Sequence, residues 1–315
     1  MSYIAVDIGA TKLRVGRGST SGLEATLVSP TPVEGGPEAI PRQIISMIEA
    51  LGVSRPQGVG IGSIGPLDLS QGAIGETPNF PHNHIPLVEP LREHLGSPVT
   101  LVNDCSAAVV GEKVYGAGRG LENLVYITMS TGLGGGAIVD GHLLMGKDGN
   151  AVEVGHLAVE PRSQILCGCG GRGHWEAFCG GRNIPRFAAH LLSQANWSGG
   201  ALHKATGGDP SKIDPPKLFQ AAEEGDPYAQ MVVQEIGWRN AVGVANTVNA
   251  YDPELITLGG SIALNHPRLI LDPILRGVED YTINRVPQIR ITPLGHEAVL
   301  LGALALAQEP SWVEG

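Results

Sequence analysis

The chain has 315 residues, of which 42% are apolar, and it carries a formal net charge of −10. This length allows two domains, or one large α/β domain, with a sizeable core. The acidic balance argues against nucleic acid as the main partner, because a phosphate backbone is bound by a basic face. It remains compatible with a small anionic ligand held by backbone amides.

The N-terminus, MSYIAVDIG, lacks the basic stretch and apolar core of a signal peptide. The longest apolar run, residues 298–307, is too short to cross a bilayer. We therefore expect a cytoplasmic protein without membrane association, in which the four cysteines are reduced thiols.

The first part of the chain alternates short apolar strands with amphipathic helices. Isoleucines spaced three and four residues apart share one face over 37–51, which predicts a helix there. The strands expected in this part are 4–6, 13–16, 58–61 and 99–102, the first two forming a hairpin around Gly9, and a second helix is expected over 106–114.

After Gly116-Ala117-Gly118 the opening plan of strand, glycine-rich turn and strand is repeated. The alternation of strands and helices predicts an α/β fold, and the break near 116–120 predicts two domains. The strands expected here are 124–129, 137–139, 255–258 and 288–291, and the helices are 215–223, 228–250 and 298–308.

Three glycine-containing turns that follow predicted strands are candidates for holding phosphate: DIGATK at 7–12, TGLGGG at 131–136 and GGS at 259–261. Glycines let backbone amides converge on an anion without side-chain clash. Asp7 would repel phosphate unless a cation such as Mg²⁺ lies between them. Each turn alone favours a plain hairpin, whereas three turns with this layout favour a phosphate site.

The stretch GIGSIG at 60–65 fits the glycine pattern of a dinucleotide site. That site would require a helix directly after the glycines. Pro66 follows instead, so we expect no nicotinamide or flavin cofactor here.

Asn103 and Asp104 follow the apolar run VTLV, at the predicted carboxyl end of a strand. Ligands of open α/β sheets bind at such ends. An aspartate there can accept a proton from a substrate hydroxyl, but Asn and Asp are also favoured helix caps. Position alone leaves capping and catalysis equally open for the two residues.

Three of the four cysteines lie within residues 167–179. Cys167, Cys169, His156 and His174 together offer two thiolates and two imidazoles, a set that suits tetrahedral Zn²⁺ without an open position. The metal would fold a loop with little apolar surface to bury. Spare thiols, a redox pair, or a ligand set with Cys179 in place of His174 are the alternatives.

Glu153, His156 and Glu176 bracket this cluster in the sequence. A sugar requires several fixed acceptors for its hydroxyls, and these side chains would supply them. For each glutamate the alternative is a solvated surface charge.

The motifs DIGATK, GIGSIGP, TPNF, VNDCSAA, STGLGGG, EVGH, CGCGGRGHWE and LGGS occur in this order from residue 7 to 261. They resemble the ROK family of sugar kinases, which includes glucokinases, fructokinases and N-acetylmannosamine kinases. The resemblance implies an actin-like (ribonuclease H-like) ATPase fold of two α/β domains with an interdomain cleft. The smaller domain would be 1–116, completed by a C-terminal helix at about 298–312, and the larger would be 117–297 with the zinc-binding loop.

The resemblance also implies an activity and its residues. The activity is ATP-dependent phosphorylation of the 6-hydroxyl of glucose, or of several hexoses, with Asp104 as the general base. The implied sugar ligands are Gly65, Asn79, Asn103, Asp104, Glu153, His156 and Glu176. ATP and Mg²⁺ would face Asp7, Gly9, Ala10, Thr11, Lys12, Thr131, Gly132 and Gly134, with Gly259 and Gly260 beside the adenosine. Structural Zn²⁺ would be held by His156, Cys167, Cys169 and His174.

Two positions depart from the family pattern. The family usually has cysteine where His174 stands, and a second glycine where Ala10 stands. Two thiolates and two neutral imidazoles balance the charge of Zn²⁺, so we expect zinc to bind still. The methyl group of Ala10 puts the detailed geometry of its loop in question.

Other functions share parts of this pattern. Fructokinase and N-acetylmannosamine kinase are alternatives within the family, because the sequence does not settle the sugar. A sugar-responsive repressor would require a helix-turn-helix ahead of the first strand, and a non-catalytic actin-like protein would not require Asn103, Asp104 and the EVGH motif. Homodimers or homotetramers are usual in the family, which leaves the oligomer open.

Overall fold

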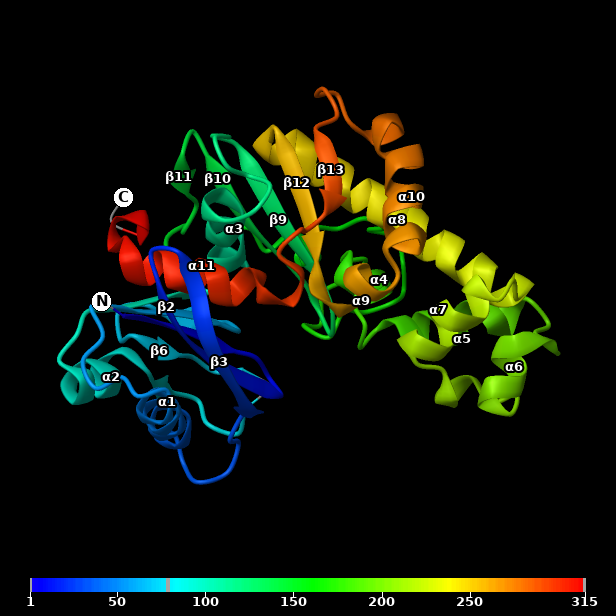
Figure 1. The fold of residues 1–315 in the computed structure, drawn as a ribbon. Coiled ribbons are helices and arrows are strands. Elements are labelled where there is room, and N and C mark those ends of the chain that lie inside the picture. The colour runs from blue at the N-terminus through cyan, green and yellow to red at the C-terminus, as the bar shows by residue number, and fades with distance from the viewer. Residues whose placement is uncertain (1, 78–79, 314–315) are drawn as a thin grey trace. The chain divides into compact units, whose positions relative to one another are not determined.

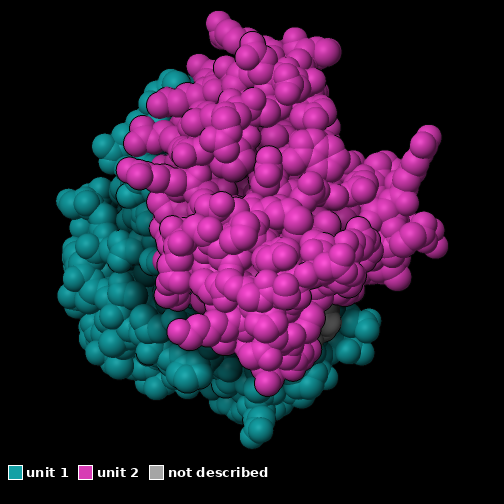
Figure 2. All heavy atoms as spheres, turned by 90° about the vertical axis from the view of Figure 1, so that its right-hand side faces the viewer, with its two compact units in different colours: residues 1–126, 136–152, 292–315 teal, residues 127–135, 153–291 magenta. Residues whose placement is uncertain are grey.

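A computed structural model of the chain describes residues 2–77 and 80–313. The chain divides into two compact units, which Figure 2 colours separately. Unit 1 comprises residues 1–126, 136–152 and 292–315, and unit 2 comprises 127–135 and 153–291. The sequence-based division into domains at 1–116 and 117–297 stays a prediction.

A five-stranded sheet in the order β3-β2-β1-β4-β8 forms the centre of unit 1 (Figure 1). β1 pairs antiparallel with β2 and parallel with β4, and β4 pairs parallel with β8. The predicted hairpin of the first two strands is confirmed. The strands are β1 Tyr3–Ile8, β2 Lys12–Ser19, β3 Gly22–Pro30, β4 Val59–Ser63 and β8 Val99–Asn103.

Different helices cover the two faces of this sheet. Ile4, Val6 and Ile8 of β1 belong to the core that includes α1 and α2, whereas Ala5 packs with Leu300 of α11. This alternation follows from the two-residue period of a strand. The helices of unit 1 are α1 Ala39–Ala50, α2 Val88–Leu95, α3 Asp104–Val114 and α11 Ala298–Gln308.

Glycines allow α11 to lie directly against the sheet and against α3. A Cβ atom added to Gly60 of β4 would lie 1.9 Å from the carbonyl oxygen of Ala303, and one added to Gly302 would lie 1.6 Å from that of Ala107. No side chain can occupy these positions without moving the backbone. The high glycine content therefore serves backbone-to-backbone packing as well as turns.

Several elements of unit 1 escaped the sequence-based prediction. β3 alternates between exposed and half-buried positions, which gives it a weak apolar signal. A small antiparallel sheet, β5 Leu67–Asp68, β6 Ala73–Ile74 and β7 Ile85–Pro86, has strands of only two residues. β4 leads into this sheet and not into a helix, which agrees with the rejection of a dinucleotide site at 60–65.

The second sheet has the order β11-β10-β9-β12-β13, and the division between the units falls within β9 and β10. The predicted turn at 131–136 is wrong from Leu133 onward, because β10 already begins there. Its glycines had indicated a turn, but Gly136 lies in the strand, where an added Cβ atom would lie 2.2 Å from the Cys105 carbonyl oxygen. The strands are β9 Leu124–Met129, β10 Leu133–Val139, β11 His142–Leu143, β12 Leu255–Gly259 and β13 Gln288–Ile291.

Unit 2 contains the longest helix described, α8 Pro227–Tyr251. Its first turn is capped by Asp226, whose side chain accepts hydrogen bonds from the amides of Tyr228 and Ala229. The prediction of a helix over 228–250 is confirmed within one residue at each end. The other α-helices of unit 2 are α4 Glu176–Cys179, α5 Ile184–Gln194, α6 Gly200–Thr206, α7 Pro215–Glu223, α9 Gly260–Asn265 and α10 Pro267–Gly277.

Five short 3₁₀ helices complete the described residues: η1 Val154–His156, η2 Pro210–Lys212, η3 Val278–Tyr281, η4 Gly295–Glu297 and η5 Pro310–Val313. Across residues 2–77 and 80–313, no helix combines the length and the apolar character needed to cross a membrane.

Candidate active site and metal cluster

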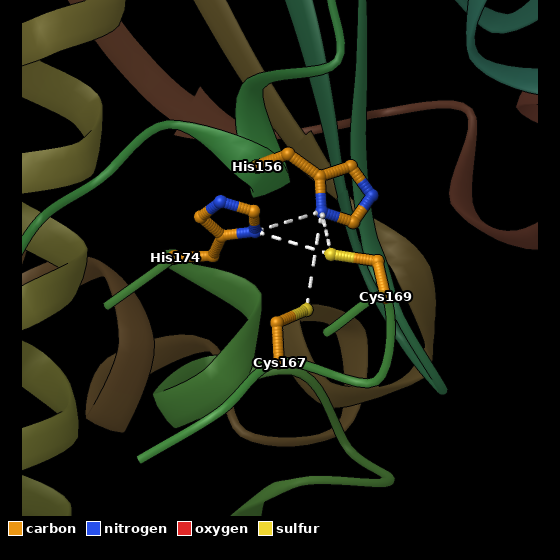
Figure 3. A group of neighbouring side chains, drawn as sticks. All are labelled: His156, Cys167, Cys169 and His174. Atoms are coloured by element: carbon orange, nitrogen blue, oxygen red, sulfur yellow. Dashed lines mark hydrogen bonds between the residues drawn. The ribbon is translucent and has the colours of Figure 1, made fainter. Parts of the chain in front are cut away.

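Four side chains in unit 2 bring their donor atoms together, as Figure 3 shows. They are His156, Cys167, Cys169 and His174, and one donor atom of each lies within 4.8 Å of all the others. The two Nδ1 atoms are 3.3 Å apart, and the Cys169 Sγ lies 3.6 Å from Nδ1 of His156 and 3.3 Å from Nδ1 of His174. The Cys167 Sγ lies 3.9 Å from Nδ1 of His156.

These spacings fit a tetrahedral zinc ion. Zn–S bonds of about 2.3 Å and Zn–N bonds of about 2.0–2.1 Å place neighbouring donors of a tetrahedral site roughly 3.3–3.8 Å apart. Burial raises the pKa of Cys167 to about 12, because the surroundings disfavour a thiolate. A bound cation would reverse that preference, since a coordinated thiol loses its proton. The four donor atoms therefore fit Zn²⁺, the metal that two thiolates and two imidazoles indicate.

A tight loop places the two cysteines. The amide of Cys167 donates to the carbonyl of Gly171 at 2.8 Å, and the amide of Gly170 donates back to Cys167 at 3.0 Å. Gly173 then approaches the preceding strand-like segment so closely that an added Cβ atom would lie 2.0 Å from the Glu160 carbonyl oxygen, and its φ is +62°. A glycine is required there to bring His174 to the cluster.

His174, and not Cys179, lies with the other three side chains of the donor cluster. Cys179 is buried on α4, and its Sγ lies 3.6 Å from the carbonyl oxygen of Ile236, toward which the thiol donates. Burial raises the pKa of its thiol, with Arg239 opposing the shift. Cys179 is not part of the donor cluster, whereas His174 is. Cys179 therefore packs toward α8 and away from the donor cluster.

The three predicted sugar acceptors of unit 2 surround the same cluster. His156 presents Nδ1 to the cluster, while its Nε2 lies 3.9 Å from Oε2 of Glu153. Glu176 Oε2 accepts a hydrogen bond from the amide of Leu133 at 2.9 Å, and its Oε1 lies 3.6 Å from the Cys167 Sγ. Glu176 thus joins the metal cluster to the start of β10.

The electrostatics of Glu153 agree with this grouping. Burial raises its pKa, the nearby His156 lowers it, and the negative charge of Glu176 raises it again. Glu153 therefore lies near both the His156 imidazole and the Glu176 carboxylate. A ligand that donates hydroxyl hydrogens would satisfy the two carboxylates better than another anion would.

The predicted ATP-binding residues at 131–134 and at 259–260 lie near each other in unit 2. Ser130 and Ser261 share a hydrogen bond of 3.0 Å between their hydroxyl oxygens. The amide of Gly181 donates to the Ser130 carbonyl, and the amide of Arg182 donates to that of Thr131. Gly260 begins α9 with φ of +83°, and an added Cβ atom there would lie 2.4 Å from the Met129 carbonyl oxygen.

In unit 1, the predicted site residues gather at one edge of the sheet. β1, β4 and β8 run parallel in register, with Ile8 opposite Ser63 and Ser63 opposite Asn103. Their carboxyl ends therefore carry the DIGATK turn, Gly65 and the Asn103-Asp104 pair at the same edge. Such an edge is where ligands of α/β sheets bind.

Asn103 and Asp104 both lie at the start of α3, and the side chains of both contact the Cys105 amide. Asn103 is the N-cap of α3, and its Oδ1 accepts from the amide of Cys105 at 2.8 Å. Asp104 Oδ1 lies 2.8 Å from the same amide, in the first turn of a helix that begins two residues earlier than predicted. A Cβ atom added to Gly65 would lie 3.6 Å from Nδ2 of Asn103, which places these two residues together. Asn79 lies outside the described residues.

Asp7 has a partner that the sequence did not indicate. The Nε of Arg14 donates to Oδ2 of Asp7 at 2.7 Å, and the guanidinium NH2 group contacts the same oxygen. Burial raises the pKa of Asp7, and the charge of Arg14 opposes that shift. Arg14 is a charged residue on β2, directly opposite Asp7 in the strand register, and only that register identifies it.

The DIGATK turn itself is held by Thr31. Its hydroxyl donates to the Gly9 carbonyl at 2.8 Å, its amide donates to the Thr11 carbonyl at 3.1 Å, and the Gly9 amide donates to the Lys12 carbonyl at 2.9 Å. Ala10 has a φ outside the left-handed region, so its methyl group fits without backbone strain. The departure from glycine at this position leaves the turn intact.

Two five-stranded sheets, with site residues in the turns at strand ends, form the actin-like ATPase fold. The chain belongs to the ROK family, whose model matches residues 3–310. It is 38% identical over 307 residues to a glucokinase of Pyrobaculum calidifontis, an alignment that covers 97% of this chain and 94% of the relative.

Two solved structures are similar throughout. The ROK hexokinase from Thermus thermophilus is 34% identical, with a TM-score of 0.81 and 98% of each chain covered. A ROK family glucokinase from Streptomyces griseus, solved in complex with glucose and AMPPNP, is 31% identical, with a TM-score of 0.81 and coverage of 98% of this chain and 100% of that one.

Proposed function

We propose that this protein is an ATP-dependent hexose kinase that phosphorylates the 6-hydroxyl of glucose. The observation that carries the proposal is the grouping of Glu153, His156 and Glu176 around the metal cluster, with Glu176 also bound to the backbone at the start of β10. The identity to named glucokinases over nearly the whole chain supports it.

In this proposal, Asp104 is the general base. Its carboxylate takes the proton of the 6-hydroxyl as the oxygen forms a bond to the γ-phosphorus of ATP. The bond from that phosphorus to the β–γ bridging oxygen breaks, and ADP leaves. The transition state of phosphoryl transfer is loose, so positioning and charge neutralisation dominate the rate. The position of Asp104 at a strand end, beside the capping residue Asn103, supports this role.

The remaining residues hold the two substrates. The sugar is bound by Gly65, Asn79, Asn103, Glu153, His156 and Glu176. The phosphates face Asp7, Gly9, Ala10, Thr11, Lys12, Thr131, Gly132 and Gly134, and the adenosine lies beside Gly259 and Gly260. Mg²⁺ bound with ATP would supply neutralisation of the phosphate charge. The contact between Ser130 and Ser261 supports a common role for the two turns of unit 2.

Zinc is proposed as a structural ion in the cluster of His156, Cys167, Cys169 and His174. All four protein positions are donors, so no position remains for substrate. The ion would fix Nδ1 of His156 and leave Nε2, beside Glu153, for a sugar hydroxyl. The metal would thereby orient a sugar ligand without touching the sugar.

We also propose that the enzyme works in the cytoplasm as a homodimer or homotetramer, with no nucleic-acid partner. The four cysteines are free thiols, which suits a reducing compartment. Light scattering of the purified protein measures the oligomer directly, and a monomer at micromolar concentration would contradict this part of the proposal.

The test is ATP consumption by the purified protein with glucose, mannose, fructose, glucosamine, N-acetylglucosamine and N-acetylmannosamine. We expect strong turnover on glucose and none without sugar. Preferred turnover on fructose or N-acetylmannosamine would keep the reaction and change the substrate. No turnover on any of the six sugars, by folded and metal-loaded protein, would overturn the proposal.

A further inference from the structure

We propose that helix α8 positions the metal loop, residues 157–175, and with it His174 and Glu176. Two side chains of α8 do so: Asn240 acts through Trp175, and Arg239 acts through Glu160. The inference rests on the proposed function, because it assigns positioning residues to the proposed sugar and metal sites. All the contacts that carry it lie within unit 2.

Trp175 stands between the metal donor His174 and the sugar acceptor Glu176 in the sequence. It is fully buried, and its indole Nε1 donates to Oδ1 of Asn240 at 2.8 Å. The ring lies against Gly243, where an added Cβ atom would come within 2.2 Å of it. The indole is therefore fixed by a hydrogen bond at one edge and by helix backbone along its face.

The side-chain amide of Asn240 is oriented toward Trp175. It is 1% exposed, and an indole N–H can only donate, so the amide must turn its oxygen toward Trp175. Its Nδ2 then has no hydrogen-bond partner within the described residues. An unpaired buried donor costs free energy. The orientation of Asn240 is thus set by the bond to Trp175.

Arg239 holds the other end of the loop. It is 6% exposed, and its Nε and NH2 groups donate to Oε2 of Glu160 at 3.0 and 2.6 Å. The amide of Glu160 donates to the Gly173 carbonyl at 3.1 Å, one residue before His174. The guanidinium carbon also lies 4.8 Å from the ring centre of Phe178 on α4, the short helix that begins with Glu176.

The composition of the metal loop explains why contacts from α8 are required to position it. Its segment from Glu160 to His174 has few apolar side chains, so packing alone cannot fix where the donor atoms lie. Outer partners of metal ligands commonly change metal affinity or activity by 10–100-fold when removed. The buried Arg239, Asn240 and Trp175 join the metal loop to α8, and the exposed Arg186 of α5 also donates to the Leu166 carbonyl.

The chain offers a matched pair of variants. Arg239 pairs with Glu160 of the loop at 2.6 Å and with Glu235 of its own helix at 2.7 Å, and the two carboxylate side chains are 36% and 43% exposed. Glu160→Gln and Glu235→Gln each remove one negative charge that lies beside the Arg239 guanidinium. Only the first weakens a link to the metal loop, because the glutamine oxygen can still accept a hydrogen bond from Arg239 but carries no charge.

The experiment measures zinc release to a colorimetric chelator and the KM values for glucose and ATP. For Glu160→Gln we expect zinc release about tenfold faster and a KM for glucose raised several-fold, with the KM for ATP within about twofold of the unmodified protein. Glu235→Gln should change none of these by more than about twofold. Equal effects of the two variants on zinc release would overturn the proposal.

Asn240→Leu tests the second contact by removing the acceptor for the indole. If it folds, we expect it to release zinc faster and bind glucose more weakly, as Glu160→Gln does, and unchanged zinc release would overturn the role of Asn240. If it does not fold, the comparison of Glu160→Gln with Glu235→Gln still decides.

Purified protein without zinc would overturn the metal assignment and this proposal together. Zinc-loaded protein that lacks sugar kinase activity would overturn only the proposed function.

Discussion

The core of unit 1 and the metal loop of unit 2 reach a defined structure in opposite ways. In unit 1, α11 lies on the sheet through glycines so close that a single methyl group at Gly60 would overlap the backbone. In unit 2, His156 and the metal loop bring four donor atoms within 4.8 Å of one another, in a segment with few apolar side chains. We propose that backbone shape specifies the first region and metal coordination the second, so the two regions should respond differently to substitution.

The largest expected effect is on the turnover rate, at Asp104, which follows strand β8 at the edge of the unit 1 sheet. Asp104→Asn should lower turnover on glucose by about a hundredfold or more, because general-base assistance is worth roughly 10²–10⁴ in rate. The asparagine oxygen can keep the hydrogen-bond contact with the Cys105 amide, so the thermal midpoint should not move. Steady-state kinetics and thermal denaturation check both statements. Asp148→Asn, at an exposed carboxylate, is the control, and near-normal turnover of Asp104→Asn would remove the base from the mechanism.

The next prediction concerns a substitution that removes one donor of the metal cluster and leaves unit 1 unchanged. Cys169→Ser replaces a donor by a group that does not form a thiolate, so metal content should fall to near zero. kcat/KM for glucose should fall by about a hundredfold, because small displacements of binding groups cost rates of this order. Cys179→Ala, at a cysteine outside the cluster, should keep its metal. Elemental analysis with kinetics decides, and a metal-replete Cys169→Ser would contradict the donor assignment.

A pair of glycine substitutions compares the two regions directly. Gly60→Ala should destabilise the protein by about 3 kcal/mol, since the new methyl group meets the Ala303 backbone. Gly168→Ala, between the two cysteine donors, meets no atom within 4 Å and should change stability by less than about 0.5 kcal/mol. Denaturant midpoints measure both. A larger loss at Gly168 than at Gly60 would reverse our account of how the two regions are specified.

The smallest expected effect is electrostatic and confined to a turn of unit 1. Hydrogen bonds from the Ser70 hydroxyl at 2.6 Å and the Gln71 amide at 3.1 Å hold the pKa of Asp68 below its usual value of 3.8. The stabilisation is present above pH 3.8 and is lost as the pH falls through the lower folded-state pKa. Asp68→Asn should therefore be slightly less stable than the unmodified protein at pH 7 and equal to it in strong acid. Thermal midpoints at the two pH values test this, and a difference that persists in acid would rule out the charge as its cause.

Local patterns in the sequence were sufficient for many elements and for the proximity of His156, Cys167, Cys169 and His174. The isoleucine spacing of α1, the apolar face of α8 and the hairpin around Gly9 are properties of adjacent residues, so period and turn chemistry identify them. The two cysteines and two histidines were recognisable because thiolates and imidazoles at such spacing have few other uses. Short or half-exposed elements such as β3 and the small sheet gave no comparable signal.

What the sequence by itself determined is the α/β class, the order of the strands that carry the turns, and the residue types of the metal cluster. Each depends on a short window of chain. The tertiary structure alone decided that Arg14 pairs with Asp7, that Cys179 packs toward α8 while His174 completes the cluster, and that Asn240 and Arg239 hold the metal loop. These contacts join residues whose separation along the chain carries no pattern, because strand register and helix packing bring them together.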